Sequence, residues 1–153
     1  MIDAWLSGIA GHLLKQRQPL LASFKLTRRC NLCCVSCPFW RQPTPDPDYD
    51  SVVDTLDQLQ RTGARLLILE GGEPFLWRDG EWGLEAVVTA AQERFAFVGV
   101  VTNGTLGLDS SADVLWVSLD GLGDSHDQNR GPTFDRILAN IAASGHPKLY
   151  VNM

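Results

Sequence analysis

All four cysteines of the chain fall between residues 30 and 37, in the stretch Cys-Asn-Leu-Cys-Cys-Val-Ser-Cys. Thiols this dense on one loop favour a soft metal, because a disulfide framework needs partners spread along the chain and an oxidising compartment. Zinc and an iron-sulfur cluster are the two candidates. Structural zinc sites draw paired ligands from separated segments, and four ligands on so short a loop would strain one tetrahedron. The spacing therefore favours an iron-sulfur cluster.

A [4Fe-4S] cube is large enough for a tight loop to reach three of its corners. Three cysteine ligands leave one iron open, whereas an electron-transfer ferredoxin closes that corner with a fourth cysteine. An open iron can bind a substrate or cofactor. The loop thus admits catalysis as well as electron transfer.

Three further motifs follow apolar runs of the sequence directly. They are Gly71-Gly72-Glu73-Pro74, Thr102-Asn103-Gly104, and Ser118-Leu119-Asp120-Gly121 with His126 and Arg130 beyond it. Glycines allow close approach of a backbone to a ligand, a serine offers a hydroxyl, and an arginine offers a planar fork suited to a carboxylate. For His126 we expect a hydrogen-bonding role, and for Trp77 and Arg78 a packing role.

These motifs need elements that bring them together. Short runs rich in strand-forming residues predict strands at 21–27, 65–70, 95–102, 114–120 and 148–153. Apolar residues at helical spacing predict helices at 51–62, 83–94 and 133–144, and one helical turn is expected at 109–112. The alternation predicts an α/β fold with parallel strands, whose carboxyl ends would place all four motifs at one site.

The cysteine motif resembles the radical S-adenosylmethionine (SAM) superfamily, whose signature is C-x3-C-x2-C. Cys30, Cys34 and Cys37 match that signature, and Arg29-Cys30-Asn31-Leu32 is typical of its lead-in. The resemblance implies that these three cysteines bind a [4Fe-4S] cluster and that Cys33 is not a ligand. Relatives usually carry an aromatic residue near the SAM adenine where this chain has Ser36, so Phe39 or Trp40 is expected to supply that surface.

The same resemblance implies the contacts to SAM. The backbone of Gly71 and Gly72 would lie against its methionine part, and Glu73 would pair with or orient its amino group. Ser118 and Arg130 match residues that contact SAM in the anaerobic sulfatase-maturing and related peptide-modifying branch, and a molybdenum-cofactor-type branch is similar in style. Asn103 would line the SAM or substrate pocket.

The family resemblance also implies a partial (β/α) barrel of six strand-helix units and reductive cleavage of SAM to a 5'-deoxyadenosyl radical. That radical would take a hydrogen atom from a small-molecule or peptide substrate, with flavodoxin or ferredoxin as electron donor. About five of the six units are expected here, because the chain ends within the fifth apolar run. We expect an amphipathic helix at 1–20 and an incomplete catalytic core at 21–153.

The charge and hydropathy of the chain exclude few functions but favour some. A formal net charge of -5 proposes no nucleic-acid partner, and no apolar run approaches the length of a membrane span. Without a signal peptide, a reducing cytoplasm is expected. Two alternatives stay open: a non-catalytic iron-sulfur or zinc module in which Cys33 is a fourth ligand, and an inactive fragment that needs a second chain.

Overall fold

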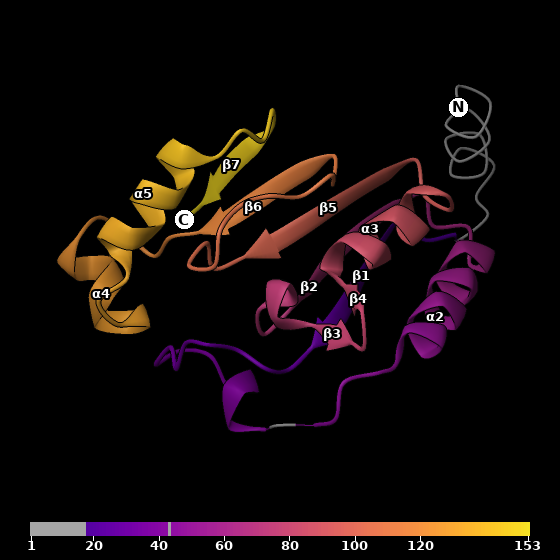
Figure 1. Ribbon diagram of the computed structural model, residues 1–153, viewed down its shortest axis with the longest axis horizontal. Helices are drawn as coiled ribbons and strands as arrows, with labels where there is room; N and C mark the ends of the chain where they lie inside the picture. Colours follow the sequence, from indigo (N-terminus) through magenta and orange to yellow (C-terminus); the bar gives the residue numbers. More distant parts are fainter. Residues whose placement is uncertain (1–17, 43) are drawn as a thin grey trace.

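The computed structural model describes residues 18–42 and 44–153 of the chain (Figure 1). Most of the helix expected at 1–20 therefore lies outside the described residues. Five strands form one sheet in the order β1-β2-β5-β6-β7, and every neighbouring pair is parallel. This confirms the α/β fold with parallel strands, in a sheet that does not close into a barrel.

The observed strands lie within two residues of the predicted bounds at each end. They are β1 Leu21–Thr27, β2 Leu66–Gly71, β5 Phe97–Thr102, β6 Val114–Ser118 and β7 Leu149–Asn152. A short antiparallel hairpin, β3 Arg78–Asp79 and β4 Trp82–Gly83, follows the 3-10 helix η2 Pro74–Leu76 and was not predicted.

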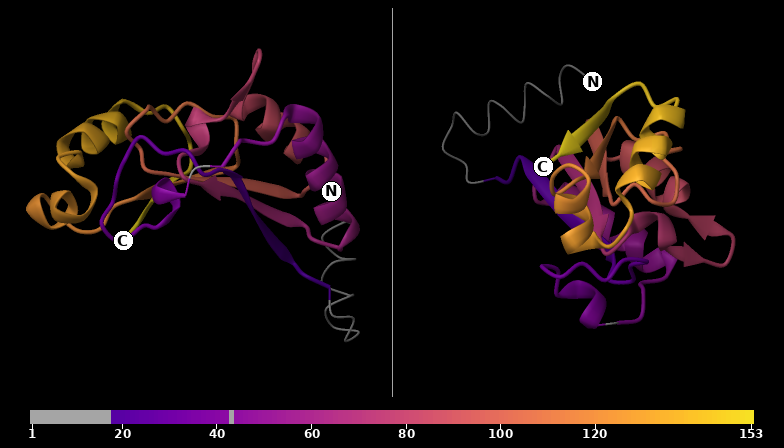
Figure 2. Two further views of the ribbon diagram at one scale, coloured as in Figure 1. Left: turned by 90° about the horizontal axis from the view of Figure 1, so that it is seen from below. Right: turned by 90° about the vertical axis from the view of Figure 1, so that its left-hand side faces the viewer.

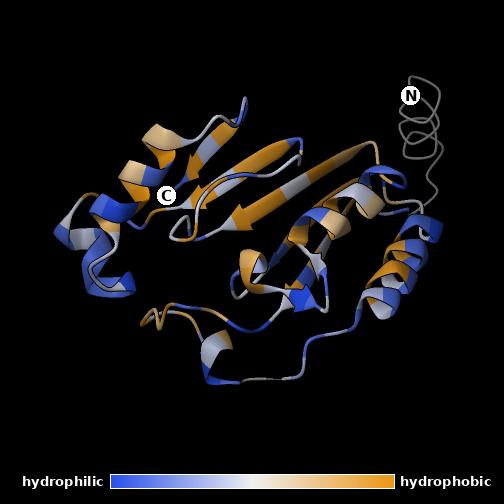
Figure 3. Cartoon of the chain, in the orientation of Figure 1, coloured by the Kyte–Doolittle hydropathy of each residue, from blue (hydrophilic) through white to orange (hydrophobic). Residues whose placement is uncertain are grey.

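Three amphipathic helices cover one face of the sheet, as Figure 2 shows: α2 Tyr49–Arg61, α3 Leu84–Gln92 and α5 Phe134–Ala143. The core lies between them and alternate strand residues such as Leu67, Val98 and Val117, which are fully buried. Figure 3 shows the same pattern, with apolar residues concentrated in the central strands and along the helix stripes. Burial of these apolar faces is the main force that holds the layers together.

The connection between β5 and β6 differs from its prediction. Residues 109–112 contain no helical turn. Ser110 Oγ accepts a hydrogen bond from Ala112 N at 3.2 Å, and the Glu85 carboxylate of α3 accepts one from Ser111 N at 2.8 Å. Side-chain oxygens thus satisfy these two backbone amides, and the segment is irregular.

A short helix, α4 Asp124–Arg130, was also missing from the predicted elements. Its residues are polar almost throughout, and only His126 is buried. The helix therefore lacks the apolar period by which helices are found in a sequence. It matters because its last turn carries Arg130.

Candidate functional site

A hollow opens at the carboxyl ends of β1, β2, β5 and β6. Its walls contain every predicted site residue except Glu73, together with several residues that were not predicted. The predicted members are Cys30, Cys34, Cys37, Gly71, Gly72, Asn103, Ser118 and Arg130. Four motifs that are far apart in the sequence thus meet at one place, as expected from the strand order.

The three signature cysteines line this hollow, and Cys33 does not. Cys34 is buried, Cys30 and Cys37 are half-buried, and Cys33 is exposed. Burial raises the pKa of the Cys30 thiol, and it also raises the pKa of the Cys34 thiol, although the nearby charge of Arg130 opposes the second shift. Ligation by these sulfurs would release their protons.

The surroundings of Cys30 fit a cluster ligand. Its sulfur accepts a hydrogen bond from Leu32 N at 3.4 Å and another from Asn103 Nδ2 at 3.7 Å. Hydrogen bonds to the sulfurs are one means by which proteins stabilise iron-sulfur clusters and tune their potential. In the described part of the chain, no three Cys, His, Asp or Glu side chains gather closely enough for a single metal ion.

The glycine motif is pressed against the start of the cysteine loop, residues 28–38. Gly72 N donates to Thr27 O at 2.7 Å, and Glu73 N donates to Arg29 O at 2.8 Å. A Cβ at Gly72 would lie 2.2 Å from Arg29 O. Any larger residue would push the two backbones apart, which explains the glycine at this position.

Arg29 ties the cysteine loop to a third segment. Its guanidinium pairs with Asp46 and donates to Leu76 O at 2.8 Å, while Asp46 also accepts a hydrogen bond from Thr27 Oγ1 at 2.6 Å. The segment that contains Asp46 is thereby tied to the start of the cysteine loop. Sequence reasoning missed Asp46, because nothing in its surroundings distinguished it from other loop carboxylates.

Glu73 has its carboxylate turned into the protein instead of the hollow. It is fully buried and accepts hydrogen bonds from Thr102 Oγ1 at 2.9 Å, Asn103 N at 2.8 Å and Phe75 N at 3.2 Å. Burial raises the pKa of this carboxyl, and the three hydrogen bonds oppose that rise. The side chain fastens the end of β5 to the glycine motif.

Asn103 stands between the cysteine loop and the end of β5. Besides its contact with the Cys30 sulfur, its Nδ2 donates to Asn31 Oδ1 at 2.9 Å. Its Oδ1 accepts hydrogen bonds from both the backbone and the hydroxyl of Thr105. Both ends of the amide are therefore fixed, and the side chain orients the first cysteine.

Arg130 reaches the hollow from the last turn of α4. Its guanidinium donates two hydrogen bonds to the carboxylate of Asp120, each of 2.8 Å, in the bidentate geometry that arginine favours. The hydrogen bond from Arg130 is the main reason that the pKa of Asp120 lies below its ordinary value. Ser118, two residues before Asp120, lines the same hollow.

His126 has the hydrogen-bonding role that was expected. It is fully buried, accepts from Asp120 N through Nδ1 at 3.3 Å, and contacts Thr133 Oγ1 through Nε2 at 3.1 Å. The neutral tautomer with a proton on Nε2 satisfies both contacts. Trp77 is likewise a packing residue as expected, because it is fully buried.

Two charged residues of the hollow were not predicted. Lys25 Nζ lies 3.0 Å from Glu70 Oε1 and 4.8 Å from the centre of the Phe39 ring. Burial raises the pKa of Glu70, but hydrogen bonds from Ser23 and Lys25 outweigh that effect and leave the pKa below its ordinary value. The alternation of Ser23 and Lys25 with the apolar residues Ala22, Phe24 and Leu26 in β1 was the signal that these side chains face away from the core.

Phe39 and Trp40, the two aromatic residues expected to compensate for Ser36, both line the hollow. Trp40 Nε1 donates to Cys34 O at 3.1 Å, which fixes the indole against the cysteine loop. Both rings are thus available to a ligand in the hollow.

Among the described residues, no helix combines the length and apolarity that crossing a membrane requires.

Comparison with known proteins agrees with this site. Residues 24–146 match the model of the radical SAM superfamily. The chain is 30% identical over 152 residues to Fe-coproporphyrin III synthase of Methanosarcina barkeri, covering 87% of this chain and 36% of that protein. It is 27% identical over 146 residues to the sporulation killing factor maturation protein SkfB of Bacillus subtilis, covering 84% of this chain and 34% of that protein.

Among solved structures, the fold resembles SuiB of Streptococcus suis bound to its precursor peptide SuiA, with a TM-score of 0.71 and 20% identity over 96% of this chain and 36% of SuiB. The chain thus spans about a third of the length of the relatives it matches. The family match extends from β1 to the end of α5 and includes all four motifs of the hollow. The chain belongs to the radical SAM superfamily, a family of enzymes that use a [4Fe-4S] cluster and SAM.

Proposed function

We propose that this chain provides the cluster-binding and SAM-binding part of a radical SAM enzyme, with Cys30, Cys34 and Cys37 as the iron ligands. The observation that carries the proposal is the single hollow in which these cysteines meet Gly71, Gly72, Asn103, Ser118 and Arg130. When bound, the cluster and SAM supply a one-electron cleavage that yields methionine and a 5'-deoxyadenosyl radical for hydrogen abstraction.

The side chains of the hollow divide the work of binding SAM. Glycine backbone at 71 and 72 allows the methionine part to approach the sheet end, and Arg130 offers positive charge to its carboxylate. Ser118 offers a hydroxyl, and Asn103 keeps the Cys30 sulfur in place from the opposite wall. Together these groups would orient SAM toward the cysteines.

Glu73 takes an indirect part in this proposal. Its oxygens already accept three hydrogen bonds inside the protein, so we assign it to positioning the glycine motif and Asn103. The amino group of SAM would then meet backbone carbonyls of the glycine motif. Of the two expected roles, pairing with the SAM amino group or orienting it, this assignment proposes an indirect form of the second.

The substrate is proposed to be a peptide or a small molecule. Relatives of both kinds are named above: one is named for synthesis of Fe-coproporphyrin III, and SuiB was solved bound to a precursor peptide. Lys25 and Glu70 line the same hollow as Arg130 and would face such a substrate with both signs of charge. Flavodoxin or ferredoxin is the proposed electron donor, in a reducing cytoplasm that keeps the four cysteines free.

Anaerobic reconstitution tests the proposal. The chain would be loaded with iron and sulfide, reduced, given SAM, and assayed for 5'-deoxyadenosine. Production of 5'-deoxyadenosine is expected from the native chain and from Cys33→Ala, but not from Cys37→Ala. A four-iron cluster that cleaves no SAM would overturn the catalytic part, and a colourless zinc protein would overturn the cluster.

A further inference from the structure

Ser36 occupies the site where the resemblance leads one to expect an aromatic ring, and the structure gives it a different partner. Its backbone N–H donates to Asn129 Oδ1 at 2.9 Å, and Asn129 Nδ2 donates back to Ser36 Oγ at 3.0 Å. The neighbouring Val35 N donates to the backbone carbonyl of Asn129 at 2.9 Å. Three hydrogen bonds thus join the middle of the cysteine loop to one residue of α4.

These contacts join parts of the chain that are distant in sequence. Ser36 and Asn129 are separated by 93 residues, and Figure 1 shows the loop after β1 running beside α4. An amide that both donates to and accepts from one serine fixes orientation as well as distance. Asn129 therefore sets where the loop between Cys34 and Cys37 lies relative to α4.

Asn129 also reaches the charged pair beside it. Its Nδ2 donates to the Asp120 carboxylate, which is the same group that Arg130 grips with two hydrogen bonds. One amide thereby contacts the cysteine loop on one side and the partner of Arg130 on the other. The cysteines and Arg130 are linked through a single connection.

We propose that Asn129 is a positioning residue that sets the cluster loop against the guanidinium of Arg130. This inference rests on the proposed function, in which Arg130 receives the carboxylate of SAM while Cys34 and Cys37 bind iron. Asn129 itself touches neither group in this arrangement. Loss of the Asn129 side chain would leave every ligand residue in the chain, but the distance between the cysteine loop and Arg130 would no longer be fixed.

The test compares Asn129→Ala, Ser36→Ala and the double variant with Gln128→Ala, an exposed neighbour on the same helix. Asn129→Ala removes both side-chain hydrogen bonds to Ser36 and should raise the KM for SAM about tenfold, with a smaller change in kcat. Ser36→Ala removes only the bond to its hydroxyl and should raise the KM by a smaller factor, and the double variant should be no worse than Asn129→Ala. Iron content should stay at the native value. Ser36→Thr, which keeps the hydroxyl, should restore a KM close to native.

Hydrogen exchange in the cluster-free chain gives a second readout that does not depend on SAM. The Ser36 amide should exchange about tenfold faster in Asn129→Ala than in Gln128→Ala, because its acceptor is gone. If the native chain fails to cleave SAM, the proposed function is overturned. Hydrogen exchange then tests by itself whether Asn129 holds the cysteine loop. If it cleaves SAM but Asn129→Ala matches Gln128→Ala, or if the two single effects multiply, the positioning role is overturned.

Discussion

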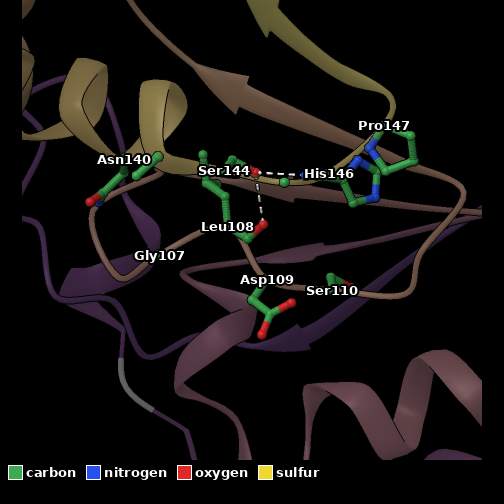
Figure 4. Close-up of a pocket in the computed structure, with 10 residues that line it drawn as sticks. Gly107, Leu108, Asp109, Ser110, Asn140, Ser144, His146 and Pro147 are labelled. Carbon is green, nitrogen blue, oxygen red and sulfur yellow. Dashed lines mark hydrogen bonds between the residues drawn. The ribbon is translucent and has the colours of Figure 1, made fainter.

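Two hollows of this molecule differ in a way that size does not reveal. The one beside α5 has a volume of about 470 Å³, against about 210 Å³ for the one that contains the cysteines. Figure 4 shows the larger hollow between the segment at 107–110 and the end of α5 with the residues that follow it. A choice by volume alone would therefore select the other hollow and not the one that contains the cysteines.

The polar groups of the larger hollow serve the backbone around them. Ser144 Oγ donates to Leu108 O at 3.1 Å, Asn140 Nδ2 donates to Gly104 O at 2.7 Å, and His146 Nε2 lies 2.9 Å from Ala112 O. They replace hydrogen bonds that a crossover helix would otherwise satisfy. In the cysteine hollow, by contrast, groups from four strand ends converge: thiols after β1, glycine backbone after β2, an amide after β5 and a hydroxyl at the end of β6, joined by a guanidinium from α4. Convergence of chemistry, more than room, identifies a functional site.

The largest difference between the two hollows is expected when an iron ligand is removed. Cys30→Ala, Cys34→Ala or Cys37→Ala should abolish the [4Fe-4S] cluster, because each variant leaves only two thiolates in the hollow to hold four irons. Cys33→Ala should keep it, since that side chain is exposed and outside the hollow. Iron and sulfide content with visible absorption after anaerobic reconstitution would check this. Loss of the cluster in Cys33→Ala would instead indicate four-thiolate ligation.

A smaller effect is expected when the residues proposed to contact SAM are changed. Arg130→Lys should weaken SAM binding by about 10- to 100-fold, because a lysine loses the planar fork of charge-assisted hydrogen bonds. Ser118→Ala should weaken it less. Asn140→Ala, in the larger hollow, is the matched control and should bind SAM as the native chain does. Calorimetry on reconstituted protein would measure the dissociation constants, and an equal loss in Asn140→Ala would erase the distinction between the hollows.

Glu73→Gln should lower the free energy of unfolding by about 1–3 kcal/mol. The carboxylate of Glu73 accepts from three buried donors, and the amide group of glutamine would place its own N–H donors against at least one of them. Chemical denaturation of the cluster-free chain would show the change. Glu81→Gln, on the exposed turn between β3 and β4, is the control and should unfold like the native chain. No difference between the two variants would contradict the role of Glu73 as a fastener.

The smallest effect concerns pH. Burial lowers the pKa of His126 below its ordinary value of 6.5, so the unfolded chain binds a proton at a pH where the folded chain does not. Stability contributed by the neutral ring is therefore present above about 6.5 and is lost as the pH falls toward the folded pKa. Titration of the ring by NMR should give a pKa below 6.5. A value above it would mean that Asp120 and Asp127 outweigh burial.

The sequence was most informative where apolar residues kept a regular period. β1 matches its prediction at both ends, and the helices that cover the sheet were found from their apolar stripes. Because parallel strands place their carboxyl ends together, the meeting of the cysteines with Ser118 and Gly71 followed from strand order alone. The family resemblance then gave these residues their roles.

Features that depend on tertiary contacts were missed. The helix α4 is stabilised by contacts of single residues within it, such as His126 on its buried side and Asn129 against the cysteine loop, and these leave no period in the sequence. The direction of the Glu73 side chain could not be predicted either, because a carboxylate next to two glycines can face either side of the strand end. Its burial follows from donors on β5, a strand that is distant in sequence.

The backbone hydrogen bonding between β1 and β2 continues past the ends of the two strands. The bonds from Gly72 and Glu73 to the carbonyls of Thr27 and Arg29 extend it into both active-site loops. Protein backbone alone makes these contacts, so they can form during folding, before any metal arrives. When a cluster is inserted, the two loops would already be ordered, so their conformational entropy would have been lost during folding. Iron could then be delivered after the chain has folded.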